Sequence, residues 1–246
     1  MNPIVIIPAR YQSTRFPGKP IAMLGNFPII WHVYSNACKA LDNVWVATDD
    51  DRIAEVVAGF GGKVVMTRPD HQSGTDRCAE AAEKLSAEFD FDVIINIQGD
   101  EPFVKVEQIR TLIDCFKDSK TEIATLIKKS EKSDLFNPNR PKVAIDIQGN
   151  ALLFSRSTIP YIRGKEQDQW IDNHTFFCHL GMYAYRFDIL KKITMLKPSS
   201  LEQVESLEQL RWLENGFRIK TAVTSFDSIG IDTPEDLEKA KEILED

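Results

Sequence analysis

Residues 3–20, PIVIIPARYQSTRFPGKP, decide the fold and point to its site. The run 4–7 is wholly apolar and stands between two prolines, which is typical of a strand buried on both faces and too short for a stable helix. The loop that follows carries three cations, Arg10, Arg15 and Lys19. Ligands of parallel α/β sheets bind beyond the carboxyl ends of the strands, so we expect this loop to line a site.

Amphipathic helices and short apolar strands alternate after this loop. The pattern predicts helix 28–41, strand 44–48, helix 51–60 capped within Asp49 to Asp51, strand 63–66, a helix capped by Thr75 and running to Leu85, and strand 93–97. Repeated alternation of this kind indicates a mostly parallel sheet covered on both faces.

The middle of the chain departs from the alternation. The pattern there predicts a hairpin of strands 143–146 and 151–154, a long strand 176–185, one helix from Ser200 to Gly216 with a Ser200–Gln203 capping box, a strand 219–223 and a last helix begun by Thr233-Pro234. The apolar face of the 200–216 helix packs either on the chain's own sheet or on a second subunit. The simplest account is one α/β domain, residues 1–246, with a mixed-strand insertion around 140–215.

Composition excludes several classes of protein. The formal charge of −7 and the pI near 5.3 argue against a nonspecific nucleic-acid binder, which needs a basic surface. The absence of a long apolar run and of a signal-peptide pattern predicts a cytoplasmic protein without membrane insertion. The four cysteines stand singly, which predicts reduced thiols, three of them on apolar helix faces, and no zinc site.

The basic loop indicates an anionic ligand. Arginine guanidinium groups fork onto phosphate oxygens and a lysine acts as a point charge, so a polyphosphate suits the three cations; the alternative is a solvated turn without a ligand. Gly18 allows close backbone approach, and Pro17 and Pro20 stiffen the loop around Lys19. Pro20 also excludes a Walker A loop, and the chain has neither a G-x-G-x-x-G nor an H-E-x-x-H motif.

Two aspartates are candidate magnesium ligands. Asp100 follows strand 93–97 and therefore lies on the same sheet edge as the basic loop, and Asp232 directly precedes the last helix. Mg²⁺ prefers one or two carboxylates together with waters and substrate phosphates. Asp232 taken alone is also typical of a turn residue.

Six segments together resemble the CMP-KDO synthetase family, the 3-deoxy-manno-octulosonate (KDO) cytidylyltransferases. They are PARYQSTRFPGKP (8–20), QGDEP (98–102), FSRSTIP (154–160), HLGMYAY (179–185), LEQLR (207–211) and DTPED (232–236). The resemblance implies a Rossmann-like nucleotidyltransferase fold, a homodimer, and Mg²⁺-dependent transfer of CMP from CTP to the anomeric hydroxyl of KDO for lipopolysaccharide synthesis. The basic loop alone would also fit CMP-sialate synthetases.

The same resemblance implies roles for individual residues. The nucleotide would be bound by Pro8, Ala9, Arg10, Ser13, Arg15, Lys19, Arg77 and Gln98. Mg²⁺ would be held by Asp100 and Asp232, and the catalytic groups would be Lys19, Arg15 and Asp100. The sugar would be bound by Arg156, His179, Tyr183, Tyr185, Glu208 and Gln209.

Other interpretations of these residues remain open at this stage. His179, Tyr183 and Tyr185 could be core side chains of their strand, and Glu208 and Gln209 point about 100° apart on a helix. His71, Asp50 and Asp51 are expected to be surface or capping groups. Pro141 and Cys178 depart from the family pattern and leave open whether the acceptor is KDO or a modified octulosonate such as an 8-amino analogue. A sialic acid is a further alternative acceptor. A nucleotide-binding protein without catalytic activity is the rival from another class.

Overall fold

A nine-stranded sheet forms the centre of the computed structural model, which describes residues 1–245. Its main path runs β11-β7-β10-β6-β1-β4-β5, and β8 and β9 extend it as a hairpin beside β10. The strands are β1 (Pro3–Ala9), β4 (Val44–Thr48), β5 (Val64–Met66), β6 (Val93–Asn96), β7 (Ile123–Lys129), β8 (Lys142–Ile145), β9 (Ala151–Ser155), β10 (Phe177–Arg186) and β11 (Ile219–Val223). A small separate sheet pairs β2 (Met23–Leu24) with β3 (Phe27–Pro28).

The sheet is mostly parallel, as the alternating sequence pattern predicted. β1 lies at its centre and pairs in parallel with β4 on one side and with β6 on the other. The exceptions are β10, which enters antiparallel between β6 and β7, and the β8–β9 hairpin, which is also paired antiparallel. The carboxyl ends of β1 and β6 therefore meet at one edge, and the loops that follow these two strands lie side by side there.

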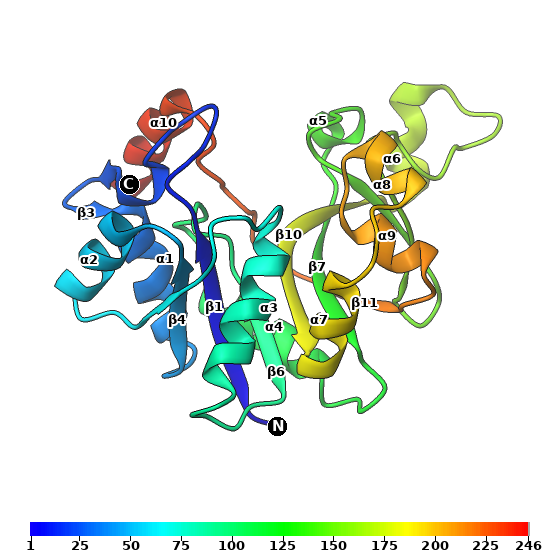
Figure 1. Cartoon of the computed structure of the whole chain (residues 1–246). Coiled ribbons are helices and arrows are strands. Elements are labelled where there is room, and N and C mark those ends of the chain that lie inside the picture. The colour runs from blue at the N-terminus through cyan, green and yellow to red at the C-terminus, as the bar shows by residue number, and fades with distance from the viewer. Residues whose placement is uncertain (246) are drawn as a thin grey trace.

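Both faces of the sheet are covered by helices (Figure 1). The helices are α1 (Ile29–Cys38), α2 (Asp51–Gly59), α3 (Gly74–Leu85), α4 (Val106–Cys115), α5 (Lys132–Leu135), α6 (Trp170–Asn173), α7 (Phe187–Thr194), α8 (Ser200–Glu205), α9 (Gln209–Glu214) and α10 (Pro234–Glu245). Short 3₁₀ turns occupy Lys19–Ile21 and Gln167–Gln169.

Side-chain alternation along β1 divides the core into two layers. Ile4 and Ile6 pack in a cluster with side chains of α3, α7 and α9, whereas Val5 and Ile7 pack with side chains of α1, α2 and α4. Successive side chains of a strand point to opposite faces, so a wholly apolar run is what a strand covered on both sides requires.

The prediction of one long helix from Ser200 to Gly216 is wrong. Two short helices, α8 and α9, replace it, because Ser206 adopts a left-handed conformation with φ 51°. The bend buries Leu207 and Leu210 but leaves Val204 82% exposed. Arg211 closes the angle between the two helices with a two-pronged ion pair to Glu202, at 2.8 and 2.6 Å.

Three smaller expectations are also corrected. The N-cap of α3 is Ser73, not Thr75, because Ser73 and Asp76 exchange hydrogen bonds of 3.1 and 3.2 Å. Cys38 is exposed, although all four cysteines are free as predicted. On α10, Ala240 is buried as expected, but Ile243 is 43% exposed. No helix within the described residues is long and apolar enough to cross a membrane.

Candidate active site

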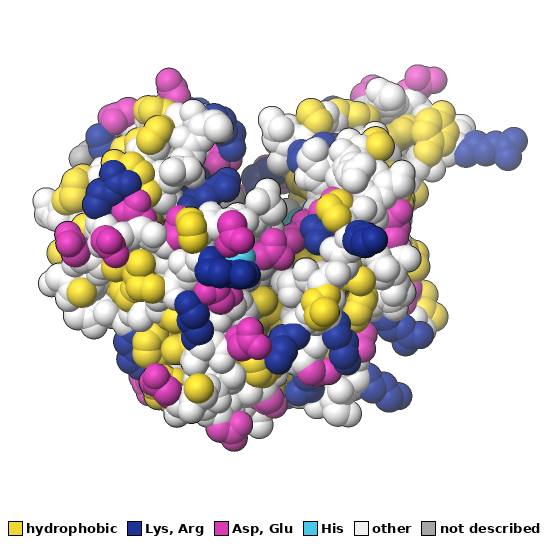
Figure 2. Space-filling model, viewed as in Figure 1, with side chains coloured by type: hydrophobic (Ala, Val, Ile, Leu, Met, Phe, Trp, Pro, Cys, Tyr) yellow, Lys and Arg dark blue, Asp and Glu magenta, His cyan; other side chains and the backbone are white. Residues whose placement is uncertain are grey.

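A cleft of about 790 Å³ opens at the carboxyl ends of β1 and β6. Figure 2 shows the molecule hollowed between its two upper parts, with Lys and Arg side chains at the hollow. All ten residues predicted to bind the nucleotide or the metal line this cleft: Pro8, Ala9, Arg10, Ser13, Arg15, Lys19, Arg77, Gln98, Asp100 and Asp232. Segments more than two hundred residues apart in the chain thus share one cavity.

The two aspartates converge on Lys19. Lys19 Nζ lies 2.5 Å from Asp100 Oδ2 and 3.2 Å from Asp232 Oδ1, and Arg15 lies 3.1 Å from the same Asp232 oxygen. The Ile231 N–H donates to the Asp100 carbonyl at 2.9 Å, which fixes the two aspartate segments to each other. Lys19 is 12% exposed, whereas Asp232 is 51% exposed and reaches solvent in the cleft.

The residues present suit a magnesium ion. Two carboxylates from different segments face the same point in the cleft, and cations that suit triphosphate oxygens surround them. A site completed by waters and substrate phosphates needs no more than these two protein ligands. The Lys19 ammonium group between the carboxylates balances their charge here. Asp232 lines the cleft and pairs with Lys19 and Arg15, and its N–H donates to Asp236 Oδ2 at 3.2 Å at the start of α10.

Tyr11 and Gly18 form the neck of the basic loop, the point where its two ends meet. Gly18 has a φ of +72°, and its N–H donates to the Tyr11 carbonyl at 2.8 Å. A Cβ placed on Gly18 would lie 3.1 Å from the Tyr11 ring. The position therefore needs glycine for its backbone conformation and also for its close approach to an aromatic ring.

Gly18→Ala is expected to destabilise the fold by about 1 to 2 kcal/mol, the cost of a left-handed residue with a side chain, and to raise KM for CTP, the substrate that the resemblance implies. Gly61 provides a matched control because its φ is +78° with nothing within 4 Å of a new Cβ. Urea unfolding of Gly18→Ala and Gly61→Ala compares the two positions. Equal losses of stability together with an unchanged KM would contradict a role for the Tyr11 contact.

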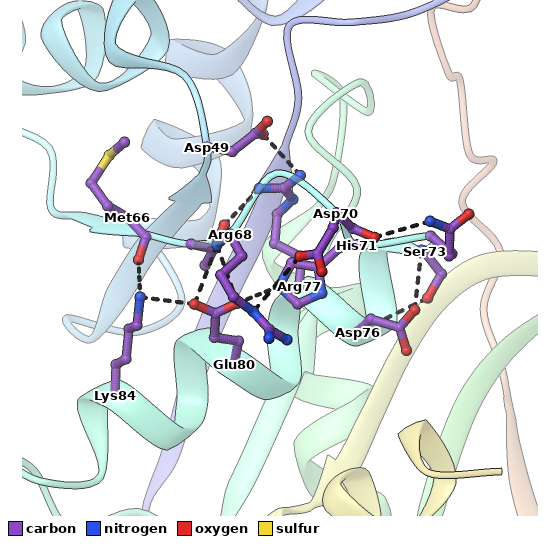
Figure 3. A network of polar contacts seen from close by, with 12 residues as sticks. Asp49, Met66, Arg68, Asp70, His71, Ser73, Asp76, Arg77, Glu80 and Lys84 are labelled. Atoms are coloured by element: carbon purple, nitrogen blue, oxygen red, sulfur yellow. Dashed lines mark hydrogen bonds and ion pairs between the residues drawn. The ribbon is translucent and has the colours of Figure 1, made fainter.

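Arg77 forms part of the cleft wall from α3. This buried guanidinium lies 2.8 Å from Asp49 and donates to Thr67 Oγ1 at 2.6 Å. Figure 3 shows it beside a second group centred on Glu80, which contacts His71, Arg68 and Lys84. His71 is therefore not the surface group expected from the sequence, because its side chain is only 7% exposed and lines the cleft. Asp50, in contrast, caps α2 as expected.

Glu80 should make stability depend on pH. Burial alone would raise its pKa, but hydrogen bonds from Lys84, the Arg68 N–H and His71 outweigh burial and lower the pKa from 4.5 to about 2. A lowered pKa stabilises the fold above the unfolded-state value and loses that effect as the pH falls from about 4.5 towards 2. Glu80→Gln should therefore lose stability most at pH 7, and the difference from wild type should shrink in acid.

Urea unfolding at pH 7, 5 and 3 measures this dependence. Glu83→Gln is the control, because Glu83 lies on the same helix, is 67% exposed, and contacts Lys191 only at 3.7 Å. An equal loss of stability for Glu80→Gln at all three pH values would show that the carboxylate charge is not the cause.

Four of the predicted sugar-binding residues form one cluster beyond the cleft. The His179 ring lies 5.1 Å from the Tyr183 ring, and Tyr183 stacks on Tyr185 at 5.9 Å. Thr75 Oγ1 donates to Glu208 at 2.7 Å. Since Ser73 and Gly74 of the same turn line the cleft, the N-terminus of α3 joins the nucleotide cleft to this cluster.

Protonation states in the cluster follow from burial. Burial lowers the pKa of His179 to about 3, so its ring is neutral at pH 7 and shares a 3.0 Å hydrogen bond with Thr125 Oγ1. Burial raises the pKa of Tyr183 well above its ordinary value and raises that of Glu208. Within the described residues, the Tyr183 hydroxyl and the Gln209 amide nitrogen are buried without a hydrogen-bond partner.

Arg156 lies apart from this cluster. Its guanidinium donates to the carbonyls of Glu205, Pro138 and Ser206 at 2.6, 2.9 and 3.3 Å. It lines a separate hollow of about 450 Å³ with Phe136 and Trp170. In this structure Arg156 holds the turn between α8 and α9, and its predicted contact with the sugar stays a prediction.

Sequence reasoning missed several residues of the cleft. They include Tyr11, Gln12, Thr14, Arg52, His71 and Gln72. His71 could have been noticed because it stands two residues before the helix cap that carries Arg77. Arg52 gave no comparable signal, since an arginine in the first turn of a helix usually lies in solvent.

Comparisons with known proteins agree with the geometry. A family model described as Cytidylyltransferase matches residues 4–221. The 3-deoxy-manno-octulosonate cytidylyltransferase of Parabacteroides distasonis is 56% identical over 99% of this chain and 98% of its own length. That of Cytophaga hutchinsonii is 58% identical over 95% of this chain and 94% of its own.

A solved structure is similar over the whole chain. The structure of CMP:2-keto-3-deoxy-manno-octonic acid synthetase complexed with CTP superposes with a TM-score of 0.92 at 40% identity, covering 100% of this chain and 99% of that one. The resemblance inferred from the six sequence segments is thereby confirmed, as is the nucleotidyltransferase fold. The chain belongs to the cytidylyltransferase family and, within it, to the 3-deoxy-manno-octulosonate cytidylyltransferases.

Proposed function

We propose that this enzyme transfers CMP from CTP to the anomeric hydroxyl of KDO, releases pyrophosphate, and so supplies an activated sugar for lipopolysaccharide synthesis. The observation that carries the proposal is the convergence of Lys19, Asp100 and Asp232 in one cleft. Full-length relatives and a structure of similar fold complexed with CTP support the choice of substrates.

The basic loop would hold the triphosphate. In the transfer, the sugar oxygen forms a bond to the α-phosphorus while the bond to the departing pyrophosphate breaks, and negative charge grows on the phosphate oxygens. Arg10, Arg15 and Lys19 face the cleft and would stabilise that charge. The buried position of Lys19 strengthens its effect, because charges interact more strongly away from water.

Asp100 and Asp232 would hold Mg²⁺. The ion, when bound, supplies positive charge to the phosphate oxygens and makes the reacting hydroxyl more acidic. The two aspartates would position that charge, and Lys19, displaced from between them, would become free to contact a phosphate oxygen. Arg15, 3.1 Å from Asp232, would move with it in the same way.

The cluster beyond the cleft would bind the sugar acid. A neutral His179 and a protonated Tyr183 can exchange hydrogen bonds with sugar hydroxyls. The Tyr183 hydroxyl, which is buried without a hydrogen-bond partner among the described residues, supports a polar ligand at this place, since buried polar groups normally have partners. His179 is a poor proton acceptor at neutral pH, so we assign it to binding rather than to proton transfer.

Pyrophosphate release with CTP, Mg²⁺ and KDO tests the function. We expect turnover with KDO and its loss when EDTA removes the metal. Turnover with a sialic acid or an 8-amino octulosonate in place of KDO would move the assignment to an analogue-specific enzyme. CTP binding without release of pyrophosphate for any of these acceptors would favour a non-catalytic nucleotide-binding protein.

We also propose that the protein is a homodimer that works in the cytoplasm. Apolar side chains are exposed on the insertion, among them Leu152 at 62%, Tyr161 at 72% and Val204 at 82%, and a second copy of the chain would remove such side chains from water. The four free thiols suit a reducing compartment.

Light scattering should give a particle of twice the 28.0 kDa chain mass. Val204→Asp should shift the mass towards the monomer, because a charge would be buried in the interface. Met23→Asp, at a position 52% exposed on the β2–β3 sheet, is the control and should leave the mass unchanged. A monomeric wild-type protein at micromolar concentration would contradict the proposal.

A further inference from the structure

Tyr11 contacts a guanidinium with its ring face and the backbone of Gly18 with its hydroxyl edge. The Arg52 Cζ atom lies 3.3 Å from the centre of the Tyr11 ring, well within the range of a cation–π contact. The ring's hydroxyl edge faces Gly18, where an added Cβ would lie within 3.2 Å. Tyr11 and Arg52 both line the nucleotide cleft.

Arg52 is itself fixed in place. Asp50 accepts from Arg52 Nε at 2.9 Å and from its terminal NH2 group at 2.6 Å, which is the two-pronged geometry of the strongest arginine pairs. Asp50 is also the N-cap of α2 and accepts from the Arg52 N–H at 3.0 Å. The guanidinium plane is therefore oriented by the start of a helix that packs on the sheet.

This arrangement acts on the neck of the basic loop. The loop closes where the Gly18 N–H meets the Tyr11 carbonyl, and the Lys19 N–H then donates to Phe16 at 3.2 Å. The hydroxyl edge of the Tyr11 ring lies against Gly18, and Arg52 covers one face of the same ring and limits its movement. Lys19 is the residue directly after Gly18, so its direction depends on this contact.

We propose that Arg52 is a positioning residue for the phosphate-binding loop: stacked on Tyr11 and fixed by Asp50, it holds the neck at Gly18 so that Lys19 and the loop arginines face the triphosphate before CTP binds. The inference rests on the proposed function, because it assumes that CTP occupies the cleft. A rigid loop binds without the cost of ordering it, so the expected effect lies on CTP affinity.

Direct phosphate contact is the competing role for Arg52. Two features disfavour it. Asp50 already occupies two of the three nitrogens of the guanidinium, and the carboxylate neutralises its charge next to the cleft. An arginine that binds phosphate through two nitrogens needs both of them available. Arg15 on the basic loop meets this need better than Arg52, because it contacts a single oxygen of Asp232.

A double-mutant cycle separates the two roles. Arg52→Lys keeps the charge but loses the flat stack and the fork, and Tyr11→Leu keeps apolar bulk but loses the ring face. Each change should raise KM for CTP about two- to fivefold, the size of one cation–π contact at an exposed site, since the Arg52 side chain is 57% exposed, with a smaller effect on kcat and none on KM for KDO. The double variant should be no worse than either single variant, because both remove the same contact.

Hydrogen exchange of the free enzyme gives a readout that does not depend on turnover. The Gly18 amide should exchange faster in Arg52→Lys than in wild type. Arg186→Lys is the matched control, since Arg186 lies 5.4 Å over Phe116 and pairs with Asp92 at 3.5 Å, beside the start of β6 and away from the cleft at its other end. It should change neither KM for CTP nor Gly18 exchange.

Either of two results would overturn the inference. Multiplicative effects of the two substitutions on KM would mean that Arg52 contacts the nucleotide by itself, and unchanged Gly18 exchange in Arg52→Lys would mean that it does not hold the neck. If wild-type enzyme fails to use CTP, the proposed function fails. The exchange measurement still tests whether Arg52, through Tyr11, holds Gly18.

Discussion

Asp100→Asn should lower kcat for pyrophosphate release by about 10³-fold without unfolding the protein. The substitution keeps the side-chain shape but removes one of the two carboxylates that face Lys19, at 2.5 Å from its Nζ. The backbone link between the Asp100 carbonyl and the Ile231 N–H, at 2.9 Å, does not depend on the side chain, so both segments should stay in place. Steady-state kinetics over a range of Mg²⁺ concentrations would measure the loss.

Asp232→Asn should have a similar effect, and the two changes together should cost little more than the larger single one, because both carboxylates serve one site. Asp188→Asn is the control, since Asp188 is 66% exposed and pairs with Lys192 at 3.0 Å within its own helix. A loss of less than tenfold for Asp100→Asn, with the Mg²⁺ dependence unchanged, would remove Asp100 from the catalytic site.

Lys19→Met should lower kcat/KM by about 10² to 10³-fold, which is the cost of losing one preorganised contact to the charge that develops in the transition state. Methionine preserves the buried apolar stem of a side chain that is 12% exposed, so the loss reports the ammonium group. Removing this cation takes one positive charge from between Asp100 and Asp232, although Arg15 still pairs with Asp232, so we expect the variant to bind Mg²⁺ more tightly than wild type does.

The comparison with Lys19→Arg separates charge from shape. Arginine restores the charge but is larger and flat, so we expect it to recover only part of the activity. Lys192→Met, at a site 60% exposed on α7, should behave as wild type. A Lys19→Met enzyme with normal kcat/KM would mean that the ammonium group only balances the two carboxylates.

The first strand and its loop could be predicted because their signals are local. An apolar run such as Ile4 to Ile7 has one stable placement, in a strand covered on both faces, and a strand of a parallel sheet sends its following loop to the ligand edge. The position of Asp100 followed from the same rule. Motifs shared with a known family then indicated that distant Asp232 belongs to the same site.

The bend between α8 and α9 could not be predicted because its cause is not periodic. Leucines continue at helical spacing through Ser206, but a single left-handed residue and the pair between Glu202 and Arg211 redirect the chain. Arg52 was missed for a related reason. Arg52 contacts the ring of Tyr11, forty-one positions earlier in the sequence, and the sequence of its own helix does not indicate that contact.

A crystal structure with CTP and Mg²⁺ would test most directly whether the cationic loop and the two aspartates serve one nucleotide. The account predicts a metal about 2.1 Å from oxygens of both Asp100 and Asp232, with the Lys19 ammonium group moved onto a phosphate oxygen. A triphosphate bound in the cleft while Lys19 keeps its ion pairs with both aspartates, and a metal held elsewhere, would contradict it.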